Sequence, residues 1–68
     1  MKDRLRKLGL PVEKGPWKSI RGRVEHYIGG YDPHFDEFLL LQDTGKGGGV
    51  AKKWVSAETF AKNYRYVG

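Results

Sequence analysis

Three groups of residues in this chain have types and spacings that could support chemistry. The first is the segment Gly45-Lys46-Gly47-Gly48-Gly49, whose backbone N–H groups could converge on a phosphate beside the Lys46 ammonium. A Walker A loop, however, places its lysine after the glycines and between a strand and a helix. Here the lysine precedes three glycines inside an expected hairpin, so the sequence does not predict a nucleotide site at this segment.

The second group consists of two histidines, His26 and His34, with the nearby carboxylates Asp32 and Asp36. Zinc takes three or four ligands in a firm geometry, and imidazole and carboxylate groups are among those ligands. These four residues lie on both sides of a Gly-Gly loop, and the chain has no cysteine to complete a site. The sequence therefore predicts neither a metal nor a cofactor.

The sequence also shows no arrangement of residues that is typical of a catalytic site. The only two serines are Ser19 and Ser56, and Ser56 is expected to cap a helix. Asp36 and Glu37 are successive residues of an expected strand, so they point to opposite faces and cannot act together as an acid and a base. We expect a protein without enzymatic activity.

The third group is basic and aromatic. One face of an expected strand carries Arg21, Arg23 and Tyr27. On this face the arginines could hold phosphates and the tyrosine ring could stack on a base. Lys52 and Lys53, on a neighbouring strand, would extend this patch. A binding site requires both arginines and at least one of these lysines to meet on one concave face, whereas a solvated outer face of any small sheet would show the same alternation.

Two further aromatic residues are candidates for contact with a partner. Tyr31 follows the Gly-Gly loop and Trp17 follows Pro16, so both could remain exposed, where aromatic rings often dominate binding. The alternative is that each ring covers the core. The complete set of predicted macromolecule-binding residues is Arg21, Arg23, Tyr27, Tyr31, Lys52, Lys53 and Trp17.

Charge is sorted along the chain. Residues 1–23 carry a net charge of +6, residues 24–45 carry −5 and residues 46–68 carry +4, for a total of +5 and an isoelectric point near 9.7. A basic protein favours anionic partners, and the sequence indicates nucleic acid or an acidic host protein. This expectation requires the basic residues of both ends to gather on one side, away from the carboxylates; an even mixture would indicate solubility alone.

Size and composition limit the other possibilities. Sixty-eight residues allow one domain, in which we expect a basic extension over residues 1–16 and a folded unit over 17–68. The longest apolar run, residues 38–41, is too short for a membrane span, and the charged N-terminus does not resemble a secretory signal. We expect a monomer or weak homo-oligomer in the cytoplasm of a host cell.

Periodicity predicts the elements that position these residues. A helix or a frayed basic arm is expected over residues 2–8, and strands are expected over 19–28, 35–42, 50–55 and 64–67. Ser56 is expected to cap a short helix over 57–63. Together these elements predict a mainly β fold, a small antiparallel SH3-like or OB-like barrel with one helix before the last strand. The expected core is Phe38, Trp54, Phe60, Tyr64, Val24, Ile28, Leu39 and Leu41.

The segment from Lys53 to Tyr64 resembles a pattern found in short phage and prophage proteins of uncharacterised role. An aromatic and a β-branched residue end a strand, a serine caps a helix, and Phe60 and Tyr64 follow four residues apart. The resemblance covers residues 36–67 and implies a small barrel and an origin in a mobile element. Combined with the basic residues described above, it leads us to expect a phage-type accessory protein that binds nucleic acid through a basic face. Alternatives are an inhibitor or adaptor docked on a host protein, or a small assembly subunit.

Overall fold

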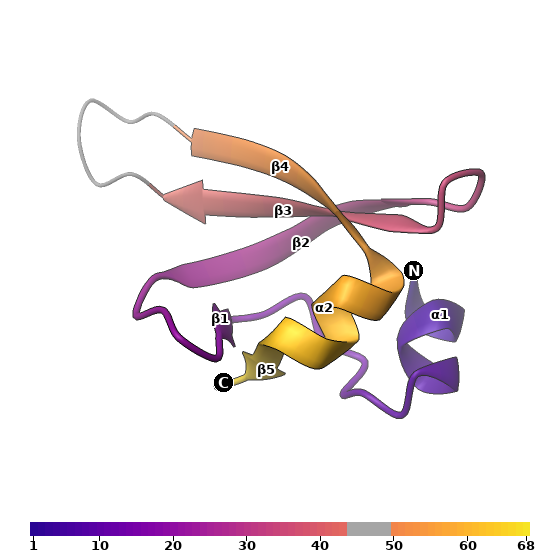
Figure 1. Ribbon diagram of the computed structural model, residues 1–68, viewed down its shortest axis with the longest axis horizontal. Coiled ribbons are helices and arrows are strands. Elements are labelled where there is room, and N and C mark those ends of the chain that lie inside the picture. The colour runs from indigo at the N-terminus through magenta and orange to yellow at the C-terminus, as the bar shows by residue number, and fades with distance from the viewer. Residues whose placement is uncertain (44–49) are drawn as a thin grey trace.

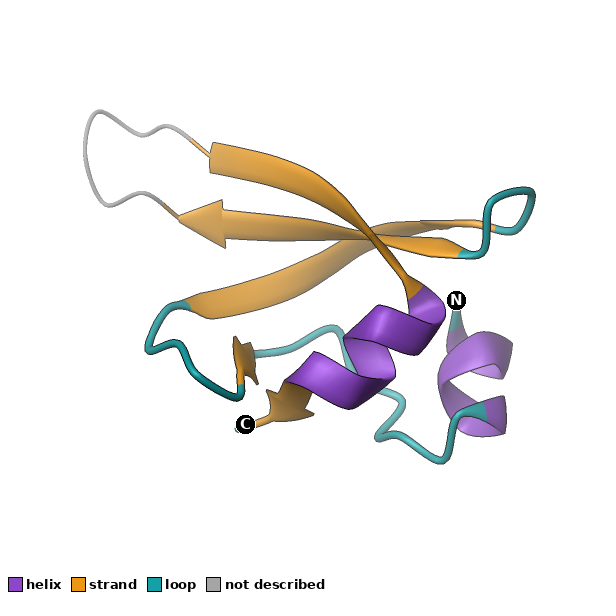
Figure 2. Ribbon diagram, in the orientation of Figure 1, coloured by secondary structure: helices purple, strands orange, loops and turns teal. Residues whose placement is uncertain are grey.

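The computed structural model describes residues 1–43 and 50–68, which form two helices and five strands. The three long strands β2, β3 and β4 lie side by side, and the second helix leads from the end of β4 to the short last strand (Figures 1 and 2). In chain order the elements are α1 (Lys2–Lys7), β1 (Trp17–Ser19), β2 (Glu25–Asp32), β3 (Glu37–Asp43), β4 (Val50–Ser56), α2 (Ala57–Asn63) and β5 (Tyr64–Tyr66).

The five strands form one antiparallel sheet in the order β4-β3-β2-β1-β5. This confirms the mainly β class and the helix that precedes the last strand. The expected closed barrel is not observed in the described residues, because β4 and β5 lie at opposite edges of the sheet and do not pair with each other. The helix α2 connects these two edges.

The predicted strand over 19–28 is wrong in its first half. Residues 20–24 connect β1 to β2, and the chain turns sharply where the Gly22 N–H donates to the Ser19 carbonyl at 3.1 Å. A Cβ on Gly22 would lie 2.5 Å from the Ser19 hydroxyl oxygen, so a larger residue at this position would require the Ser19 side chain to move. Ile20 and Val24, which seemed to belong to a buried face, are therefore exposed.

A bulge in β2 changes the face on which its later residues lie. Ile28 pairs with Leu40, but the next partner, Leu39, is opposite Gly30, so Gly29 is an extra residue in β2. Tyr31 consequently pairs with Phe38 and packs beside it on the core face, with ring centroids 5.2 Å apart. Gly30 lies on the opposite face with Leu39.

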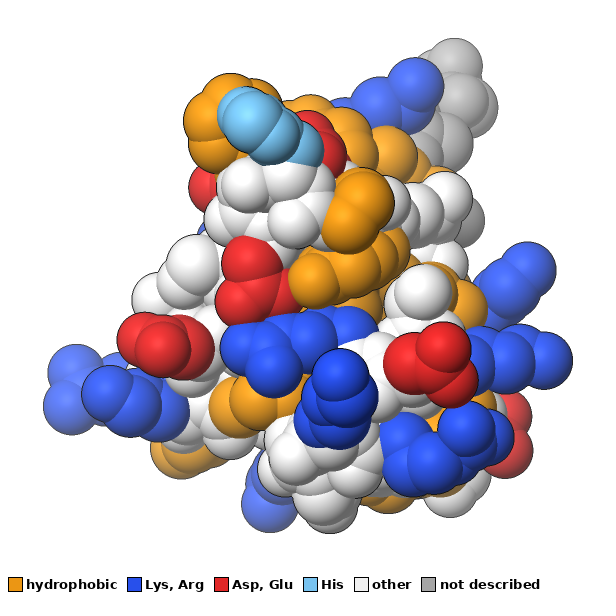
Figure 3. All heavy atoms as spheres, turned by 90° about the vertical axis from the view of Figure 1, so that its right-hand side faces the viewer, with side chains coloured by type: hydrophobic (Ala, Val, Ile, Leu, Met, Phe, Trp, Pro, Cys, Tyr) orange, Lys and Arg blue, Asp and Glu red, His pale blue; other side chains and the backbone are white. Residues whose placement is uncertain are grey.

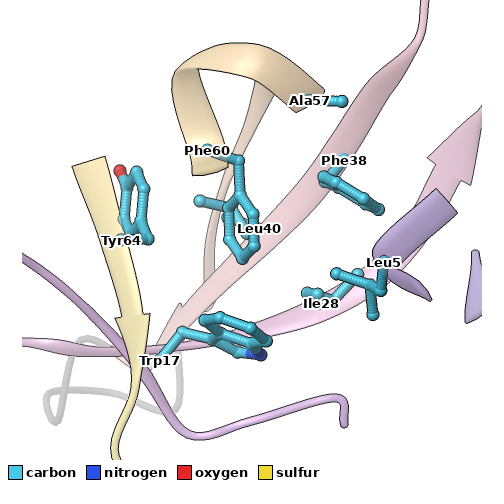
Figure 4. Close-up of a cluster of buried hydrophobic side chains, with 8 residues drawn as sticks. All are labelled: Leu5, Trp17, Ile28, Phe38, Leu40, Ala57, Phe60 and Tyr64. Carbon is cyan, nitrogen blue, oxygen red and sulfur yellow. The ribbon is translucent and has the colours of Figure 1, made fainter. Parts of the chain in front are cut away.

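The core face of the sheet carries Ile28, Phe38 and Leu40, and helix α2 adds Phe60 to the same cluster. Figure 4 shows these side chains converging between the sheet and the helices. The cluster of fully or nearly fully buried residues is Leu5, Trp17, Ile28, Phe38, Leu40, Ala57, Phe60 and Tyr64. The sequence correctly assigned Ile28, Phe38, Phe60 and Tyr64 to it.

The two tryptophans lie on opposite sides of the sheet, and the prediction that Trp54 belongs to the core is wrong. Trp17 is 0% exposed, its indole N–H donates to the Glu13 carbonyl at 3.0 Å, and its ring packs against Phe60. Trp54 is 51% exposed because it pairs with Leu39 on the side of the sheet opposite the core. Leu39 and Leu41 lie on the same side of the sheet as Trp54, so they too are outside the core. Val24 is exposed in the β1–β2 connection.

The first sixteen residues pack on the sheet. Leu5 of α1 is completely buried, and Leu8, Leu10 and Val12 pack against the core cluster. A backbone hydrogen bond also joins this segment to β2, because the Lys14 carbonyl accepts from the Ile28 N–H at 2.7 Å. The boundary at residue 16 stays a prediction, and the segment before it contributes to the same hydrophobic core.

Helix α2 begins as the sequence predicts. The Ser56 hydroxyl accepts from the Thr59 N–H at 3.2 Å, which satisfies one of the free backbone donors at the start of the helix. The helix then stacks Phe60 on Tyr64, with centroids 5.2 Å apart and rings nearly parallel. Over the described ranges, neither helix has the length and apolar character that crossing a membrane requires.

Candidate functional site

A concave site with a volume of about 670 Å³ lies between α2, β4 and the start of the β1–β2 connection. We call it the basic groove because Arg21 and Lys53 both line it, and its lining residues in the described part of the chain include no carboxylate. The residues that line the basic groove are Ser19, Ile20, Arg21, Lys53, Val55, Thr59, Asn63 and Tyr64.

The fold explains how two residues that are 32 positions apart meet here. Lys53 is on the core face of β4, where it pairs with Leu40, and it extends beyond the core at the free edge of the sheet. Arg21 is presented by the tight turn after β1, which is anchored where the Ile20 N–H donates to the Asn63 carbonyl at 2.7 Å. The basic groove thus receives Lys53 from β4 at one edge of the sheet and Arg21 from the turn after β1.

Tyr64 occupies the floor of the groove and is held on both sides. Phe60 stacks on one part of its ring, His26 contacts it edge-on at 5.5 Å, and the Lys53 Nζ lies 5.8 Å from the ring centroid. A cation within about 6 Å of an aromatic face is attracted to it. The tyrosine therefore positions Lys53 and is not available to stack on a ligand.

His26 lies beneath this arrangement and is buried. Burial first, and the positive charge of Lys53 second, lowers the pKa of His26 below its usual value of 6.5. The imidazole is therefore neutral at physiological pH, and it supports Tyr64 by packing. This role differs from the metal ligand that was considered for this residue.

The structure brings together only part of the predicted site. Arg21 and Lys53 meet in the basic groove, whereas Arg23 does not line it and is exposed in the β1–β2 connection. Lys52 and Tyr27 share the opposite face of the sheet, in one row with Leu41. The expectation that Tyr27 lies beside Arg21 on a continuous strand face is therefore wrong, because the chain turns between them.

Two other predicted contact residues have structural partners. Trp17 is wholly buried, so its ring offers no surface to a macromolecule; of the two alternatives for this residue, the one in which its ring covers the core is observed. Tyr31 is partly buried, and its hydroxyl donates to Asp36 Oδ1 at 2.5 Å. This hydrogen bond belongs to a second polar cluster that the sequence analysis did not identify.

The second cluster, which we call the Arg4 cluster, consists of Arg4, Tyr31 and Asp36. Arg4 donates from Nε and Nη2 to the two oxygens of Asp36, each at 2.8 Å, in a bidentate ion pair. These contacts lower the pKa of Asp36 and raise that of Tyr31. The Asp36 carbonyl also accepts from the Ala57 N–H at 2.8 Å, so the cluster links α1, the β2–β3 turn and α2.

One sequence signal could have indicated this cluster. Asp36 has a positive φ of 54°, a conformation that aspartate tolerates better than most residues, and it follows Asp32, whose side chain caps the turn by accepting from the His34 N–H at 2.9 Å. An Asp-Pro-His-Phe-Asp turn next to a tyrosine thus marks a fixed carboxylate. Its arginine partner is 32 residues away and has no local signal.

Positive and negative side chains are mixed at the end of the molecule that carries α1. On the face shown in Figure 3, Lys and Arg side chains occupy much of the lower half, and Asp and Glu side chains lie among them. The expected separation of all basic residues from all carboxylates is therefore not observed on this face. It holds locally, in the lining of the basic groove.

The remaining sequence candidates do not form a site within the described part. The glycine-rich segment Gly45–Gly49 lies outside the described residues. Within residues 1–43 and 50–68, no group of three or more His, Cys, Asp or Glu side chains is arranged to hold a metal ion. Comparison with protein-family models, with curated proteins and with solved structures finds no match for this chain.

Proposed function

We propose that the protein is a non-catalytic module that binds nucleic acid, and that the basic groove holds the phosphates. The observation that carries this proposal is that Arg21 and Lys53 line one concave site, among whose described lining residues there is no carboxylate. Arginine and lysine are the main phosphate-binding side chains, and each phosphate contact releases counterions.

The other lining residues suit a phosphate chain. Ser19, Thr59 and Asn63 place hydroxyl and amide groups around the two cations, and such groups supply many of the contacts to phosphate and sugar oxygens. Ile20 and Val55 add apolar walls. The lowered pKa of His26 leaves that residue neutral, so Arg21 and Lys53 supply the positive charge.

We further propose that the open five-stranded sheet is a member of the SH3-like class, in which one helical turn separates the last two strands. The strand order β4-β3-β2-β1-β5 with α2 between β4 and β5 supports this assignment. A phage-type accessory role, acting in the cytoplasm of a host, remains our proposal for its biological setting and rests on the resemblance in residues 53–64.

The function is tested by fluorescence anisotropy with labelled DNA and RNA oligomers across a salt range of about 50 to 200 mM. We expect binding that weakens steeply with salt. The double variant Arg21→Gln/Lys53→Gln should reduce the magnitude of the slope of log K against log salt by about 1.4–1.8, because each of the two lost phosphate contacts removes about 0.7–0.9.

The matched control is Arg6→Gln/Lys7→Gln, which removes the same net charge from the exposed side of α1. Its slope should remain close to that of the wild type. Equal losses in the two double variants would refute the groove as the binding site. A lack of binding to every oligomer at low salt would refute the function itself.

A further inference from the structure

The side of the sheet opposite the core carries an exposed apolar surface. Strand register places Tyr27, Leu41 and Lys52 in one row across β2, β3 and β4, and Gly30, Leu39 and Trp54 in the adjacent row. Trp54 is 51% exposed and Tyr27 is 44% exposed. We call these six residues the aromatic face: Tyr27, Gly30, Leu39, Leu41, Lys52 and Trp54.

Gly30 leaves space in the middle of the aromatic face. A Cβ built on Gly30 would have one neighbour within 4 Å, the Cβ of Leu39 at 3.9 Å, so the position is open above the sheet. Gly29 differs, because the Leu41 side chain leans over it and would lie 2.7 Å from an added Cβ. The position above Gly30 is therefore open beside Leu39, in the row that Trp54 also occupies, and a planar group can approach the sheet there.

The aromatic face is continuous with the basic groove through a single strand. Lys53 and Trp54 are successive residues of β4, so one points to the groove and the other to the aromatic face, and β4 is the free edge between them. Lys52 adds a cation to the aromatic face itself. A chain that crosses the β4 edge can therefore place anionic groups at Lys53 and planar groups at Trp54.

Charge favours an anionic occupant along β4. This strand carries Lys52 and Lys53 and no carboxylate, and the net charge of +5 is one that a second copy would share. The carboxylates Glu25 and Glu37 of this face belong to the neighbouring strands: Glu25 lies two positions from Tyr27 along β2, opposite Lys18 of β1, and Glu37 lies two positions from Leu39 along β3. An anionic ligand with planar groups should therefore lie along β4.

We propose that the aromatic face binds unpaired bases of a single-stranded nucleic acid, which stack at Trp54 and Tyr27 while its phosphates follow β4 to Lys53 and Arg21. This inference rests on the proposed function and names the form of nucleic acid that the protein selects. Bases in a duplex are stacked on one another and cannot reach the rings, whereas single strands expose every base to an aromatic platform.

The test compares a single-stranded oligothymidylate with a DNA duplex of equal phosphate content. We expect the wild type to bind the single strand more tightly. Trp54→Ala should weaken single-strand binding by roughly 5- to 150-fold, the usual effect of losing one stacking ring, and should leave duplex binding within about twofold. Phe35→Ala is the matched control, because Phe35 is a 67% exposed aromatic of the β2–β3 turn outside this face.

Intrinsic fluorescence supplies an independent measurement. Trp17 is fully buried, so a stacked base should quench the emission of Trp54 and leave that of Trp17. In Trp54→Phe the quenching should disappear, while part of the affinity remains because phenylalanine can still stack. Gly30→Val should fill the gap and weaken single-strand binding, and its melting temperature should not fall, because β-branched residues are favoured in strands.

Each outcome either supports or overturns the inference. Equal affinity for single strand and duplex, or equal losses in Trp54→Ala and Phe35→Ala, would overturn it while leaving the proposed function intact. A dimer seen by sedimentation and abolished by Trp54→Ala would assign the face to a second copy instead. If neither nucleic acid binds at low salt, both the inference and the proposed function fail.

Discussion

The basic groove and the Arg4 cluster both use arginine, and the comparison shows how partners decide what a cation does. Arg4 is held by both oxygens of Asp36 at 2.8 Å, and Tyr31 donates to the same carboxylate. Arg21 lies in a groove whose lining, over residues 1–43 and 50–68, includes no carboxylate. The paired guanidinium of Arg4 links parts of the fold, whereas our proposal assigns the charges of Arg21 and Lys53 to a ligand.

The two regions are also connected to different parts of the fold. The Arg4 cluster joins α1 to the β2–β3 turn and, through the Asp36 carbonyl, to the start of α2. The basic groove uses the other end of α2, near Asn63, and the turn after β1. Changes in the cluster should therefore alter stability, and changes in the groove lining should alter binding.

The largest effect is expected for Phe60→Ala. Phe60 is fully buried and contacts the rings of Trp17, Phe38 and Tyr64, so it holds the α2 wall of the groove against the core. Its loss should cost about 3–5 kcal/mol, comparable to the whole stability of a domain this small. Urea unfolding monitored by circular dichroism should show a largely unfolded variant. Phe35→Ala, at an exposed ring, should unfold like the wild type.

We expect Arg4→Gln to change stability and Arg21→Gln to change nucleic-acid binding. Arg4→Gln removes the bidentate pair and should lower the melting temperature by less than Phe60→Ala does, without changing the salt slope of nucleic-acid binding. Arg21→Gln should lower that slope by about one and leave the melting temperature unchanged. Thermal unfolding and anisotropy on both variants give the answer. If Arg4→Gln changes binding as much as Arg21→Gln does, the contrast between the regions is wrong.

Ser56→Ala should lower the stability of the fold by a smaller amount, at the helix α2 that connects the two regions. The Ser56 hydroxyl caps α2 at the end next to the Arg4 cluster. Loss of such a cap typically costs about 1 kcal/mol, and threonine should restore most of it. Chemical denaturation of Ser56→Ala and Ser56→Thr measures this. A cost well above 2 kcal/mol would mean that the serine does more than cap the helix.

The smallest effects are expected from pH, and they occur in two separate ranges. The pKa of His26 is lowered in the fold, so the unfolded chain binds more protons as pH falls below about 6.5, and stability decreases there. The pKa of Asp36 is lowered from 3.8 by Arg4 and Tyr31, so its contribution is present above that value and is lost as pH falls below it.

Melting temperatures between neutral pH and pH 3 should therefore show an upper step from the groove region and a lower step from the Arg4 cluster. His26→Gln should flatten the upper step only, and Arg4→Gln should flatten the lower step only. If both variants flatten the same range, the assignment of the steps to the two regions is incorrect.

The sequence predicts the second half of the fold well because its signals are local. Phe38 and Leu40 alternate with Leu39 and Leu41, and Ser56 has the type and position of a helix cap, so β3, β4, α2 and β5 appear close to their predicted ranges. The first half fails at Ile20 and Val24, whose alternation resembles a strand. The tight turn at Gly22 overrides that pattern.

Face assignment in β4 could not be obtained from its own residues. The run Lys52-Lys53-Trp54-Val55 gives each face one lysine and one apolar residue, so alternation has no preferred phase. Pairing of Val55 with Phe38 decides it and turns Trp54 outward and Lys53 toward the groove. For the same reason the sequence could list both lysines as candidates but could not say which one Arg21 meets.

The bulge at Gly29 has a consequence for how this protein tolerates change. Gly29 is the extra residue of the pair, so deleting it would leave Ile28 opposite Leu40 and Gly30 opposite Leu39, and both faces would keep their residues. One further residue inserted after Gly29 would reverse the phase of everything that follows in β2, so Tyr31 would turn away from Asp36 as Gly30 turned inward. Two surfaces on opposite sides of the molecule would be lost by one insertion that alters no side chain of either. Evolution and engineering should therefore find this strand tolerant of losing the bulge and intolerant of an insertion.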